Sequence, residues 1–545
     1  MNASAEEPTS GGRSELIRPT VAGKSLKEIA ALAGAVDSPT RGDRAANADI
    51  TGITLDSRRV AVGDLYAALP GANAHGASFA KQAIDAGAVA VLTDRAGAEI
   101  LERDSDFNSD VNTDVNSAFV PVIVASDPRS RLGRISSWIY DDPSAQLKII
   151  GITGTDGKTT VAMLAEAGLR ASGLETGLIG TVATRIGAQT LASIRTTPEA
   201  PDLHALLAVM VERGVQAVAM EVSSHALTLG RVSGVDVDVA VFTNLGHDHL
   251  DFHGDQEHYF EAKASLFTPE YAQQAIVCID DVWGRRLAAR ALIPTTTFSV
   301  SANSQAGGEL VPDWTVTDID TQEVGWTFRL VSPVGSFPGG CRLPGLFNVS
   351  NAVAAVAAVS VLTGDPASAA AGVASSPGVP GRMEQVGFGG GTAVLVDYAH
   401  TPDAVIRAIA VGRTIAASRS GRLVVVLGCG GDRDREKRPL MGAAAVRGAD
   451  VAIITDDNPR SEDPAKIRRE MMAGMASGVP AIHAETVEIG DRVAALTHAV
   501  RIAGPNDVIL ALGKGHEATQ EINGVRFPLD DREVLAAARR GTVSD

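Results

Sequence analysis

A glycine-rich loop at residues 151–160 constrains the fold of this chain more than any other stretch of the sequence. The mostly apolar run 147–152 predicts a buried strand, and the spacing of apolar residues after Lys158 predicts a helix. Between them, Gly154 and Gly157 allow backbone N–H groups to curl around an anion. The dipole of the helix N-terminus and the positive charge of Lys158 would also attract the anion. This order of strand, loop and helix predicts an α/β fold with a nucleotide phosphate site.

The loop departs by one residue from the standard pattern G-x-x-x-x-G-K-[ST], because Ile152 stands where the first glycine is expected. A glycine-rich turn after a strand is common by itself, and a lone Gly-Lys-Thr is weak evidence. Here the strand, the glycines, the lysine and the helix all agree, which favours a nucleotide. The hydroxyl of Thr159, directly after the lysine, is placed to ligate Mg²⁺.

The length of 545 residues predicts three or four domains, at roughly 150 residues for each. Strands and helices alternate in two stretches, which predicts a central P-loop ATPase-type parallel sheet and a C-terminal Rossmann-like domain, after a smaller N-terminal α/β domain. We expect these domains to span residues 1–127, 128–381 and 382–545. Residues 1–20 are predicted to be a disordered tail, and the acidic, Asn-rich segment 103–117 a surface loop.

Composition disfavours several classes of partner. The net charge of −17 and the aromatic content of 4% disfavour a nucleic acid. The three cysteines have no metal-ligand spacing, which is typical of a reducing compartment. The Ala- and Val-rich run 352–362 is shorter than the ~20 residues that span a bilayer, and the N-terminus has no signal-peptide core. We therefore expect a cytoplasmic protein without membrane insertion.

Polar residues follow the predicted strands of the central sheet, where parallel α/β folds collect their ligands. Glu221 closes one strand, and the segment 247–253, with three histidines, follows the next. A carboxylate and an imidazole near a phosphate loop suit a Mg²⁺-nucleotide site. The His-x-His-x-Asp spacing also allows a zinc hydrolase site, although Phe252 separates the aspartate from the third histidine. A purely structural role for the histidines is the third interpretation.

Three further polar motifs follow strands in the C-terminal third, at residues 428–438, 456–460 and 513–517. Each of them alone could be a solvated turn. Together they place arginine, asparagine and glutamate at one edge of a sheet. This set suits a zwitterion, because arginine binds a carboxylate through two hydrogen bonds and glutamate meets an ammonium group.

These motifs, in this order, resemble the Mur ligases of peptidoglycan synthesis, from about residue 50 to about residue 529. The motifs that carry the resemblance are Thr153–Thr160, Glu221–His225, Thr243–Gly254, Phe347–Asn351, Asp397–Asp403, Asp457–Arg460 and Gly513–Glu517. The resemblance implies ATP-dependent amide synthesis through an acyl phosphate. The γ-phosphate of ATP would pass to the glutamate carboxylate of UDP-N-acetylmuramoyl-L-alanyl-D-glutamate, and an incoming amine would then expel it.

The resemblance also implies roles for individual residues. ATP would contact Gly154, Thr155, Asp156, Gly157, Lys158, Thr159, Thr160, Asn348, Arg382, Asp397 and His400. Two Mg²⁺ ions would be held by Thr159, Glu221, His249 and Lys263. Lys263 matches a lysine that CO₂ carbamylates to N6-carboxylysine, and the catalytic set would be Lys158, Glu221, His249 and Lys263. The UDP-substrate would contact Ser57, Asn73, Ala74, Thr196, Thr197, Ser223 and Arg231.

The resemblance implies a diamino acid as the third substrate. We expect the enzyme to be a monomer. The contacts of the diamino acid would be Arg433, Asp457, Asn458, Arg460, Gly513 and Glu517. Arg460 in Asp-Asn-Pro-Arg favours meso-diaminopimelate, because the extra carboxylate of that amino acid is a natural partner for an arginine. L-Lysine and L-ornithine are the alternatives.

The chain departs from the family pattern at several positions. Cys278 replaces an asparagine usual near adenine, Asp156 an asparagine of the phosphate loop, and His247 an arginine, while the segment 103–117 resembles an insertion. Two other functions stay open. A folylpolyglutamate synthase of the same superfamily would lack the uridine-type first domain that residues 55–58 suggest. A non-catalytic nucleotide-binding relative is disfavoured by the intact lysines, glutamate and histidine.

Overall fold

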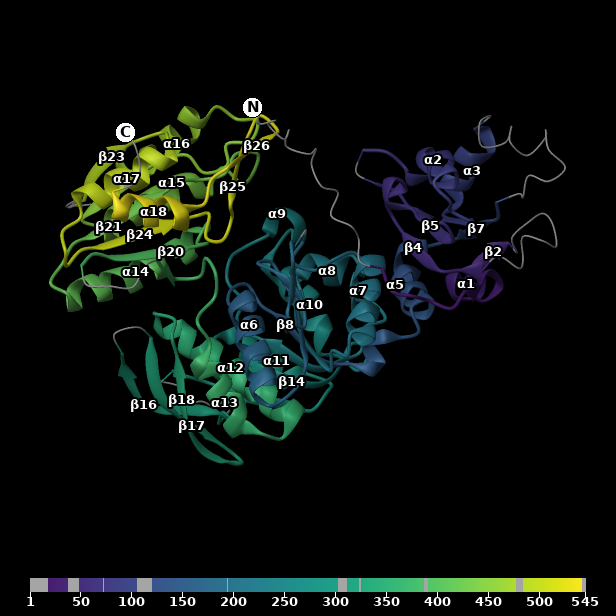
Figure 1. The fold of residues 1–545 in the computed structure, drawn as a ribbon, viewed down its shortest axis with the longest axis horizontal. Coiled ribbons are helices and arrows are strands. Elements are labelled where there is room, and N and C mark those ends of the chain that lie inside the picture. Colours follow the sequence, from purple (N-terminus) through teal and green to yellow (C-terminus); the bar gives the residue numbers. More distant parts are fainter. Residues whose placement is uncertain are drawn as a thin grey trace, which may run out of the picture.

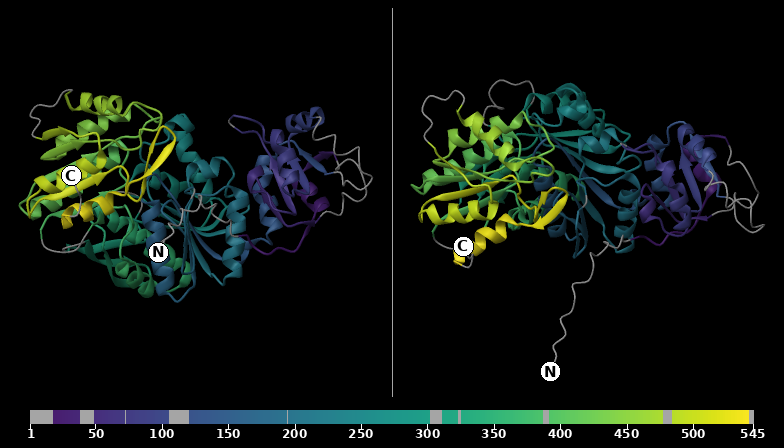
Figure 2. Two further views of the ribbon diagram at one scale, coloured as in Figure 1. Left: turned by 45° about the horizontal axis from the view of Figure 1, so that its top comes forward. Right: turned by 90° about the horizontal axis from the view of Figure 1, so that it is seen from above.

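The computed structural model describes residues 18–37, 49–71, 73–104, 120–193, 195–301, 311–322, 325–386, 391–476 and 484–541. The chain forms three α/β domains, each around a sheet of its own. The N-terminal and C-terminal domains lie on opposite sides of the central domain, in purple, yellow-green and teal respectively (Figures 1 and 2).

The N-terminal domain has a five-stranded sheet in the order β2-β7-β6-β5-β4. Its strands β4 to β7 are parallel, and β2 is antiparallel to β7. The strands are β2 (Ala35–Asp37), β4 (Gly52–Thr54), β5 (Asp64–Ala68), β6 (Ala90–Thr93) and β7 (Val122–Ala125), beside the short pair β1 (Lys24–Ser25) and β3 (Asp49–Ile50). The helices are α1 (Leu26–Ala33), α2 (Ala80–Asp85) and α3 (Arg95–Arg103); α5 (Pro128–Ile139), which leads into the central domain, packs against the same core.

The central domain has an eight-stranded sheet in the order β11-β10-β9-β12-β8-β13-β14-β15. Six strands are parallel, and β10 and β11 add an antiparallel edge. The strands are β8 (Lys148–Thr153), β9 (Thr176–Ile179), β10 (Thr184–Ile186), β11 (Gln189–Leu191), β12 (Ala217–Glu221), β13 (Val237–Phe242), β14 (Ala272–Cys278) and β15 (Thr295–Phe298). Strand β8, which leads into the phosphate loop, is therefore an inner strand with neighbours on both sides.

Helices cover the central sheet, and a small antiparallel sheet extends the domain. The helices are α6 (Lys158–Ala171), α7 (Ala200–Glu212), α8 (Ser224–Thr228), α9 (Leu250–His253), α10 (Gln256–Ala264), α11 (Val282–Arg290), α12 (Leu346–Thr363) and α13 (Pro366–Ser375). The small sheet contains β16 (Thr315–Thr321), β17 (Trp326–Ser332) and β18 (Gly335–Cys341).

Helix α12 is the one helix in the described part of the chain that is long and apolar enough to cross a membrane. It has 18 residues, and 67% of its apolar window is buried inside the domain. Residues Ala352 to Val359 are at most 1% exposed and belong to a core shared with α6 and the central sheet. Its burial is that of a core helix.

The C-terminal domain has a six-stranded sheet in the order β19-β20-β24-β21-β22-β23, parallel except for β19. Its strands are β19 (Glu384–Gln385), β20 (Ala393–Asp397), β21 (Leu423–Leu427), β22 (Val451–Ile454), β23 (Glu485–Glu488) and β24 (Val508–Leu512). Its helices are α14 (Pro402–Ser418), α15 (Lys437–Gly448), α16 (Pro464–Ala476), α17 (Arg492–Ile502) and α18 (Asp531–Arg540). A separate hairpin, β25 (Thr519–Ile522) and β26 (Val525–Pro528), follows the last strand.

The structure corrects the prediction that the tail is disordered up to residue 20. Arg18 donates a hydrogen bond of 2.7 Å to Asp64, whose side chain is 1% exposed, and the Thr20 N–H donates to Glu212. A buried carboxylate needs a cationic or hydrogen-bonding partner, which gives Arg18 a fixed place. Residues 1–17, and the expected surface loop after Asp104 up to residue 117, lie outside the described residues.

Candidate functional site

The phosphate loop begins where β8 ends and closes where α6 starts. Gly154 has φ +145° and Gly157 has φ +87°, both in the range that favours glycine. A Cβ atom on Gly154 would lie 1.9 Å from the Thr243 hydroxyl oxygen, so the loop approaches β13 too closely for any other residue. Ile152, the departure from the standard pattern, is a fully buried residue of β8 and lies before the loop.

Two lysine ammonium groups meet at one carbonyl oxygen of this loop. Nζ of Lys158 donates to the carbonyls of Gly154 and Thr155 at 2.8 and 2.9 Å, and Nζ of Lys263 donates to Gly154 at 2.8 Å. Burial lowers the pKa of both lysines, and for Lys263 the neighbouring Lys158 charge lowers it further. Nζ of Lys263 also lies 4.4 Å from the centre of the Tyr259 ring.

A threonine hydroxyl and a buried carboxylate form the opposite wall. Oγ1 of Thr159 donates to Oε2 of Glu221 at 2.9 Å, and Thr181 donates its N–H and its hydroxyl to the same carboxylate at 2.6 and 3.2 Å. Glu221 lies opposite Ile152 in the adjacent parallel strand, which explains why the end of β12 reaches the loop. Glu221 is 1% exposed and forms no ion pair within the described ranges. A hydroxyl beside an unpaired carboxylate suits a hard divalent cation.

His249 lies at the rim of this site with a left-handed backbone, at φ +55°. Its ring lies edge-on to His225, with 4.8 Å between the ring centres, and its Nε2 is 3.3 Å from Asp248. Burial lowers the pKa of His249 to about 4, so its ring is neutral and can offer a lone pair at neutral pH. No three His, Cys, Asp or Glu side chains cluster as a metal site anywhere in the described parts of the chain. The zinc hydrolase arrangement is therefore not formed.

The residues expected to bind the muramoyl peptide lie next to Glu221. Thr197 donates its hydroxyl to the Glu221 carbonyl at 2.9 Å and accepts the Ser223 N–H at 3.1 Å. Thr196 lies beside Thr181, with 3.0 Å between the hydroxyl oxygens. Arg231 instead pairs with Glu199 at 2.9 Å and does not line the cavity.

The residues expected to bind uridine lie apart from this group, in the N-terminal domain. Ser57 is 7% exposed and donates its hydroxyl to Gln82 at 2.9 Å. Asn73 and Ala74 are exposed in the chain segment after β5. The structure therefore places the three residues in one domain but not at the phosphate loop.

A cavity of about 790 Å³ lies between the central and C-terminal domains. Most of the predicted nucleotide and metal residues line it, together with two of the peptide residues: Thr155, Asp156, Gly157, Lys158, Thr159, Thr160, Thr196, Glu221, Ser223, His249, Lys263, Asn348, Arg382, Asp397 and His400. From the C-terminal side, Arg382 donates to the Thr159 hydroxyl at 3.2 Å, and Arg407 forms an ion pair with Asp156. The two domains thus meet at the phosphate loop.

Three of the cavity residues are held by local hydrogen bonds. Asp397 accepts the N–H groups of Met383 and Ala399 at 2.7 and 2.8 Å, and burial raises the pKa of its carboxyl. Nδ1 of His400 lies 2.9 Å from the Tyr398 carbonyl oxygen, and burial lowers the pKa of the ring. Asn348 donates to the Pro344 carbonyl at 2.7 Å and accepts from Asn351 at 2.9 Å. These contacts fix the polar groups before any nucleotide binds.

The predicted amino-acid residues form a second group at the carboxyl ends of β21, β22 and β24. Asn458 donates to Glu517 at 2.8 Å, and Arg460 donates to the Gly431 carbonyl at 2.7 Å. A Cβ atom on Gly513 would lie 2.5 Å from the Asp457 carboxylate. Arg433 is exposed on the first of the three loops. This group does not line the cavity.

Comparisons with known proteins agree with this geometry. Residues 49–140 match the Mur ligase family catalytic domain, residues 152–359 the Mur ligase middle domain, and residues 381–515 the Mur ligase glutamate ligase domain. The UDP-N-acetylmuramoyl-L-alanyl-D-glutamate–2,6-diaminopimelate ligase of Streptomyces coelicolor is 50% identical over 498 residues, which cover 91% of this chain and 94% of the relative.

The chain belongs to the Mur ligase family. The UDP-N-acetylmuramyl-tripeptide synthetase of Leifsonia xyli is 40% identical, over 95% of this chain and 96% of that protein. A solved structure of a UDP-N-acetylmuramoyl-L-alanyl-D-glutamate–2,6-diaminopimelate ligase is 32% identical, with a TM-score of 0.63 over 95% of this chain and 99% of that one. The similarity therefore extends over all three domains of this Mur ligase.

Sequence reasoning missed several residues of the Mur ligase cavity. Thr181 follows the strand β9, so the rule that ligands gather at the carboxyl ends of parallel strands could have found it. Tyr259 lies one helical turn before Lys263 and lines the same wall. Arg407 gave no sequence signal, because it is 251 residues from its partner Asp156.

The departures from the family pattern have structural counterparts. Asp156, in place of asparagine, is the residue that pairs with Arg407 across the domain gap. Cys278, in place of asparagine, lines the cavity with its Sγ 3.8 Å from the Ser350 hydroxyl. Burial raises the pKa of Cys278 to about 12, so it presents a neutral thiol to whatever fills this part of the cavity. His247 is exposed.

Proposed function

We propose that this Mur ligase joins meso-diaminopimelate to the D-glutamate carboxylate of UDP-N-acetylmuramoyl-L-alanyl-D-glutamate, at the expense of ATP, for peptidoglycan and cell wall synthesis. The observation that carries the choice of amino acid is the position of Arg460 at a strand end, two residues after Asn458, which donates to Glu517 at 2.8 Å. An arginine can bind the extra carboxylate of diaminopimelate in two-pronged fashion, and the glutamate can meet an ammonium group. The diaminopimelate ligase of Streptomyces coelicolor, at 50% identity, supports the same choice.

The nucleotide half of the reaction uses the cavity between the domains. Lys158 and the loop N–H groups of residues 154–160 would hold the β- and γ-phosphates, and Arg382, Asp397, His400 and Asn348 would contact the rest of ATP. The Thr159 hydroxyl and Glu221 would hold one Mg²⁺, and His249 with Lys263 a second. When bound, Mg²⁺ neutralises charge on the phosphates.

The reaction needs no reactant besides ATP, the UDP-dipeptide and the amino acid. An oxygen of the D-glutamate carboxylate attacks the γ-phosphorus and releases ADP, which leaves an acyl phosphate. The free amine of the third substrate attacks the acyl carbon, loses a proton and expels inorganic phosphate. Two contacts from the C-terminal domain to the loop, Arg382 to Thr159 and Arg407 to Asp156, support a closed state that keeps water from the acyl phosphate.

Lys263 would act as a carbamate, N6-carboxylysine. CO₂ reacts with a neutral amine, and burial beside Lys158 favours the neutral form of Lys263 by lowering its pKa. Carbamylation exchanges a cation for an anion, which turns a residue that repels Mg²⁺ into one that can ligate it. The remaining substrate residues would be Ser57, Asn73 and Ala74 for uridine, and Thr196, Thr197, Ser223 and Arg231 for the muramoyl peptide.

The domain assignments follow the same division of labour. Residues 1–127 would bind the UDP moiety, residues 128–381 ATP, and residues 382–545 the amino acid, through Arg433, Asp457, Asn458, Arg460, Gly513 and Glu517. We place the enzyme in the cytoplasm, where its soluble nucleotide and amino-acid substrates are found. We expect it to act as a monomer, without nucleic-acid or membrane partners.

Phosphate release tests this function. Enzyme, ATP, Mg²⁺ and the UDP-dipeptide are combined with meso-diaminopimelate, L-lysine or L-ornithine in separate reactions. We expect release above background with diaminopimelate. Release with lysine or ornithine instead would retain the ligase reaction and overturn the assignment of the amino acid, and no release with any of them would favour a non-catalytic relative.

A further inference from the structure

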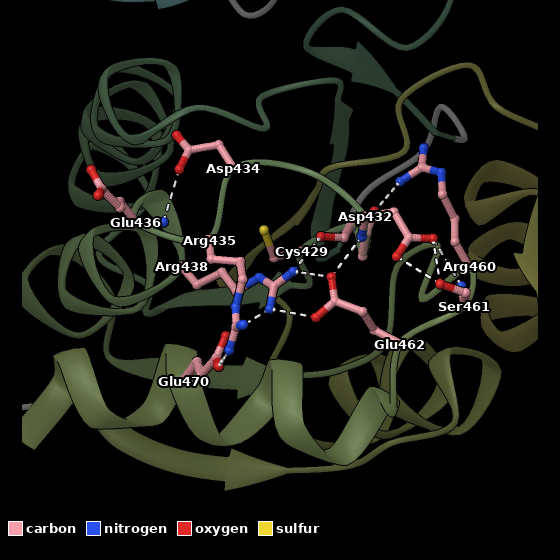
Figure 3. A network of polar contacts seen from close by, with 12 residues as sticks. Cys429, Asp432, Asp434, Arg435, Glu436, Arg438, Arg460, Ser461, Glu462 and Glu470 are labelled. Atoms are coloured by element: carbon pink, nitrogen blue, oxygen red, sulfur yellow. Dashed lines mark hydrogen bonds and ion pairs between the residues drawn. The ribbon is translucent and has the colours of Figure 1, made fainter. Parts of the chain in front are cut away.

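A buried arginine lies beneath the proposed amino-acid site. Arg438, at the start of α15, is completely buried, although an arginine is almost never buried without partners. It donates to both carboxylate oxygens of Glu462 at 2.7 and 3.0 Å, to Glu470 at 2.6 Å and to the Gly430 carbonyl at 3.3 Å. Figure 3 shows Arg438 between the two glutamates. None of these three side chains has a role in the proposed reaction.

Glu462 joins the two loops that carry the site. Besides Arg438, its Oε1 accepts the N–H of Asp432 at 2.6 Å, and Asp432 belongs to the loop after β21. Glu462 itself follows β22, two residues after Arg460. The hydrogen bonds from Arg438 lower the pKa of Glu462 to about 2, so the bridge is ionised at every physiological pH. One carboxylate therefore ties both loops to one buried cation.

A second contact ties the loops on their exposed side. Asp432 accepts the Ser461 N–H at 3.0 Å and its hydroxyl at 2.8 and 2.9 Å (Figure 3). The loops also touch directly, because a Cβ atom on Gly431 would lie 2.0 Å from the Pro459 carbonyl oxygen. The residues directly before and after Arg460, Pro459 and Ser461, thus both contact the loop after β21.

Arg460 needs such support because its backbone is unusual. It has φ +51°, a left-handed conformation uncommon for residues other than glycine. Its N–H donates to the Glu521 carbonyl at 3.0 Å, its carbonyl accepts from Asn523 at 2.6 Å, and its guanidinium donates to Gly431 at 2.7 Å. Nε of Arg460 also lies 3.9 Å from Oε2 of Glu521 on β25, so the direction of the guanidinium depends in part on where the loop after β21 lies.

We propose that Glu462 and Arg438 are positioning residues that hold Arg460 in the orientation in which it selects an amino acid with a second carboxylate. The proposal rests on the proposed function. A two-pronged bond from arginine to carboxylate is sensitive to direction, so release of the loops would weaken this contact and leave the contacts of ATP and of the UDP-dipeptide in place.

Steady-state kinetics of Glu462→Gln test the proposal. Glutamine keeps the size of the side chain but removes the charge that pairs with Arg438. We expect the KM for meso-diaminopimelate to rise by about 10- to 100-fold, the cost of a misplacement near 1 Å, with unchanged KM values for ATP and for the UDP-dipeptide and a retained kcat. Ser461→Ala, an exposed substitution that loosens only the second contact, should give a smaller rise of the same kind.

Glu470→Gln is the matched control. It removes a carboxylate from the other side of Arg438 but touches neither Asp432 nor Ser461 and leaves the Arg438–Glu462 bonds in place, so the KM for meso-diaminopimelate should rise far less than in Glu462→Gln. An equal rise in this control would assign the effect to a general loosening of the domain and overturn the proposal. The proposal would also be overturned if Arg460→Lys raised the KM for meso-diaminopimelate but Glu462→Gln and Ser461→Ala both left it unchanged. If the wild-type enzyme does not use diaminopimelate at all, the proposed function fails instead.

Discussion

Lys263 donates its ammonium hydrogen to the carbonyl oxygen of Gly154, which is also the acceptor of the phosphate-loop lysine. A cation buried beside another cation at a phosphate site serves no obvious structural purpose, since each charge destabilises the other. The proposed carbamylation of Lys263 would remove this conflict, because it would replace one of the two cations by an anion.

The first prediction concerns this lysine. Lys263→Ala should lower kcat by at least about 100-fold, because it removes an anion proposed to hold Mg²⁺ at the reacting phosphate. Short carboxylates such as acetate or propionate should restore part of the activity by entering the vacated space. Lys263→Arg, which keeps the positive charge but cannot form the carbamate, should be equally inactive and should not be rescued. Full activity in either variant would refute the carbamate role.

The second prediction concerns Glu221. Glu221→Gln should lower kcat/KM by about 10²- to 10³-fold and raise the Mg²⁺ concentration that gives half-maximal activity, because an amide holds a divalent cation less tightly than a carboxylate. The measurement is a Mg²⁺ titration of phosphate release. Glu175→Gln, an exposed position before β9, is the control. An unchanged Mg²⁺ dependence in Glu221→Gln would exclude Glu221 as a ligand.

The third prediction concerns the ion pair of Asp156 with Arg407. Both side chains are more than 40% exposed, so the pair stabilises the closed arrangement by at most about 1 kcal/mol. Asp156→Asn should lower the KM for ATP by about two- to fivefold at low ionic strength, because it removes a negative charge from the phosphate site and frees Arg407 for the nucleotide. When Arg407 is already replaced by glutamine, Asp156→Asn should lower the KM for ATP by a smaller factor. A raised KM in Asp156→Asn would contradict this account.

The fourth prediction concerns stability below neutral pH. His204 is fully buried, with Nε2 3.0 Å from the Ser233 carbonyl, and burial lowers its pKa from 6.5 to about 4. The unfolded chain binds a proton more readily than the folded one between these values, so stability falls as pH falls from 6.5 towards 4. At pH 5 the loss from this residue is about 2 kcal/mol.

Thermal unfolding at pH 7 and pH 5 measures this loss. Wild-type protein should show a larger decrease in unfolding temperature than His204→Gln, which has no group to titrate at this position. Other buried histidines contribute to both proteins equally, so the difference between the two decreases isolates His204. Equal decreases would show that His204 is not protonated on unfolding.

Much of the fold was predictable because its strands are apolar and end at polar residues. The strand before the phosphate loop, predicted at residues 147–152, is observed as β8 at Lys148–Thr153. Local patterns did not predict β10 and β11, or the hairpin β25 and β26, because strands of three or four residues carry little periodic signal and β11 and β26 are largely exposed. Yet β25 and its turn hold the backbone of Arg460.

The site was predictable to a similar extent. Glycines, Lys158 and Glu221 are marked by their places at strand ends, and the structure brings them together in one cavity. The contacts of Thr159 with Arg382 and of Asp156 with Arg407 join residues more than 200 positions apart, which no local pattern reveals. Arg438 looked like part of a charged, solvated loop, but it is buried because two glutamates from the next segment neutralise it.

A competition experiment tests the central claim most directly. The enzyme is given ATP, Mg²⁺, the UDP-dipeptide and an equimolar mixture of meso-diaminopimelate, L-lysine and L-ornithine, and the mass of the nucleotide product is determined. We predict one product, heavier than the UDP-dipeptide by the mass of diaminopimelate less water. In Arg460→Ala we expect this product to be lost, and no single competitor to take its place. A product that contains lysine or ornithine in the wild-type reaction would contradict the account.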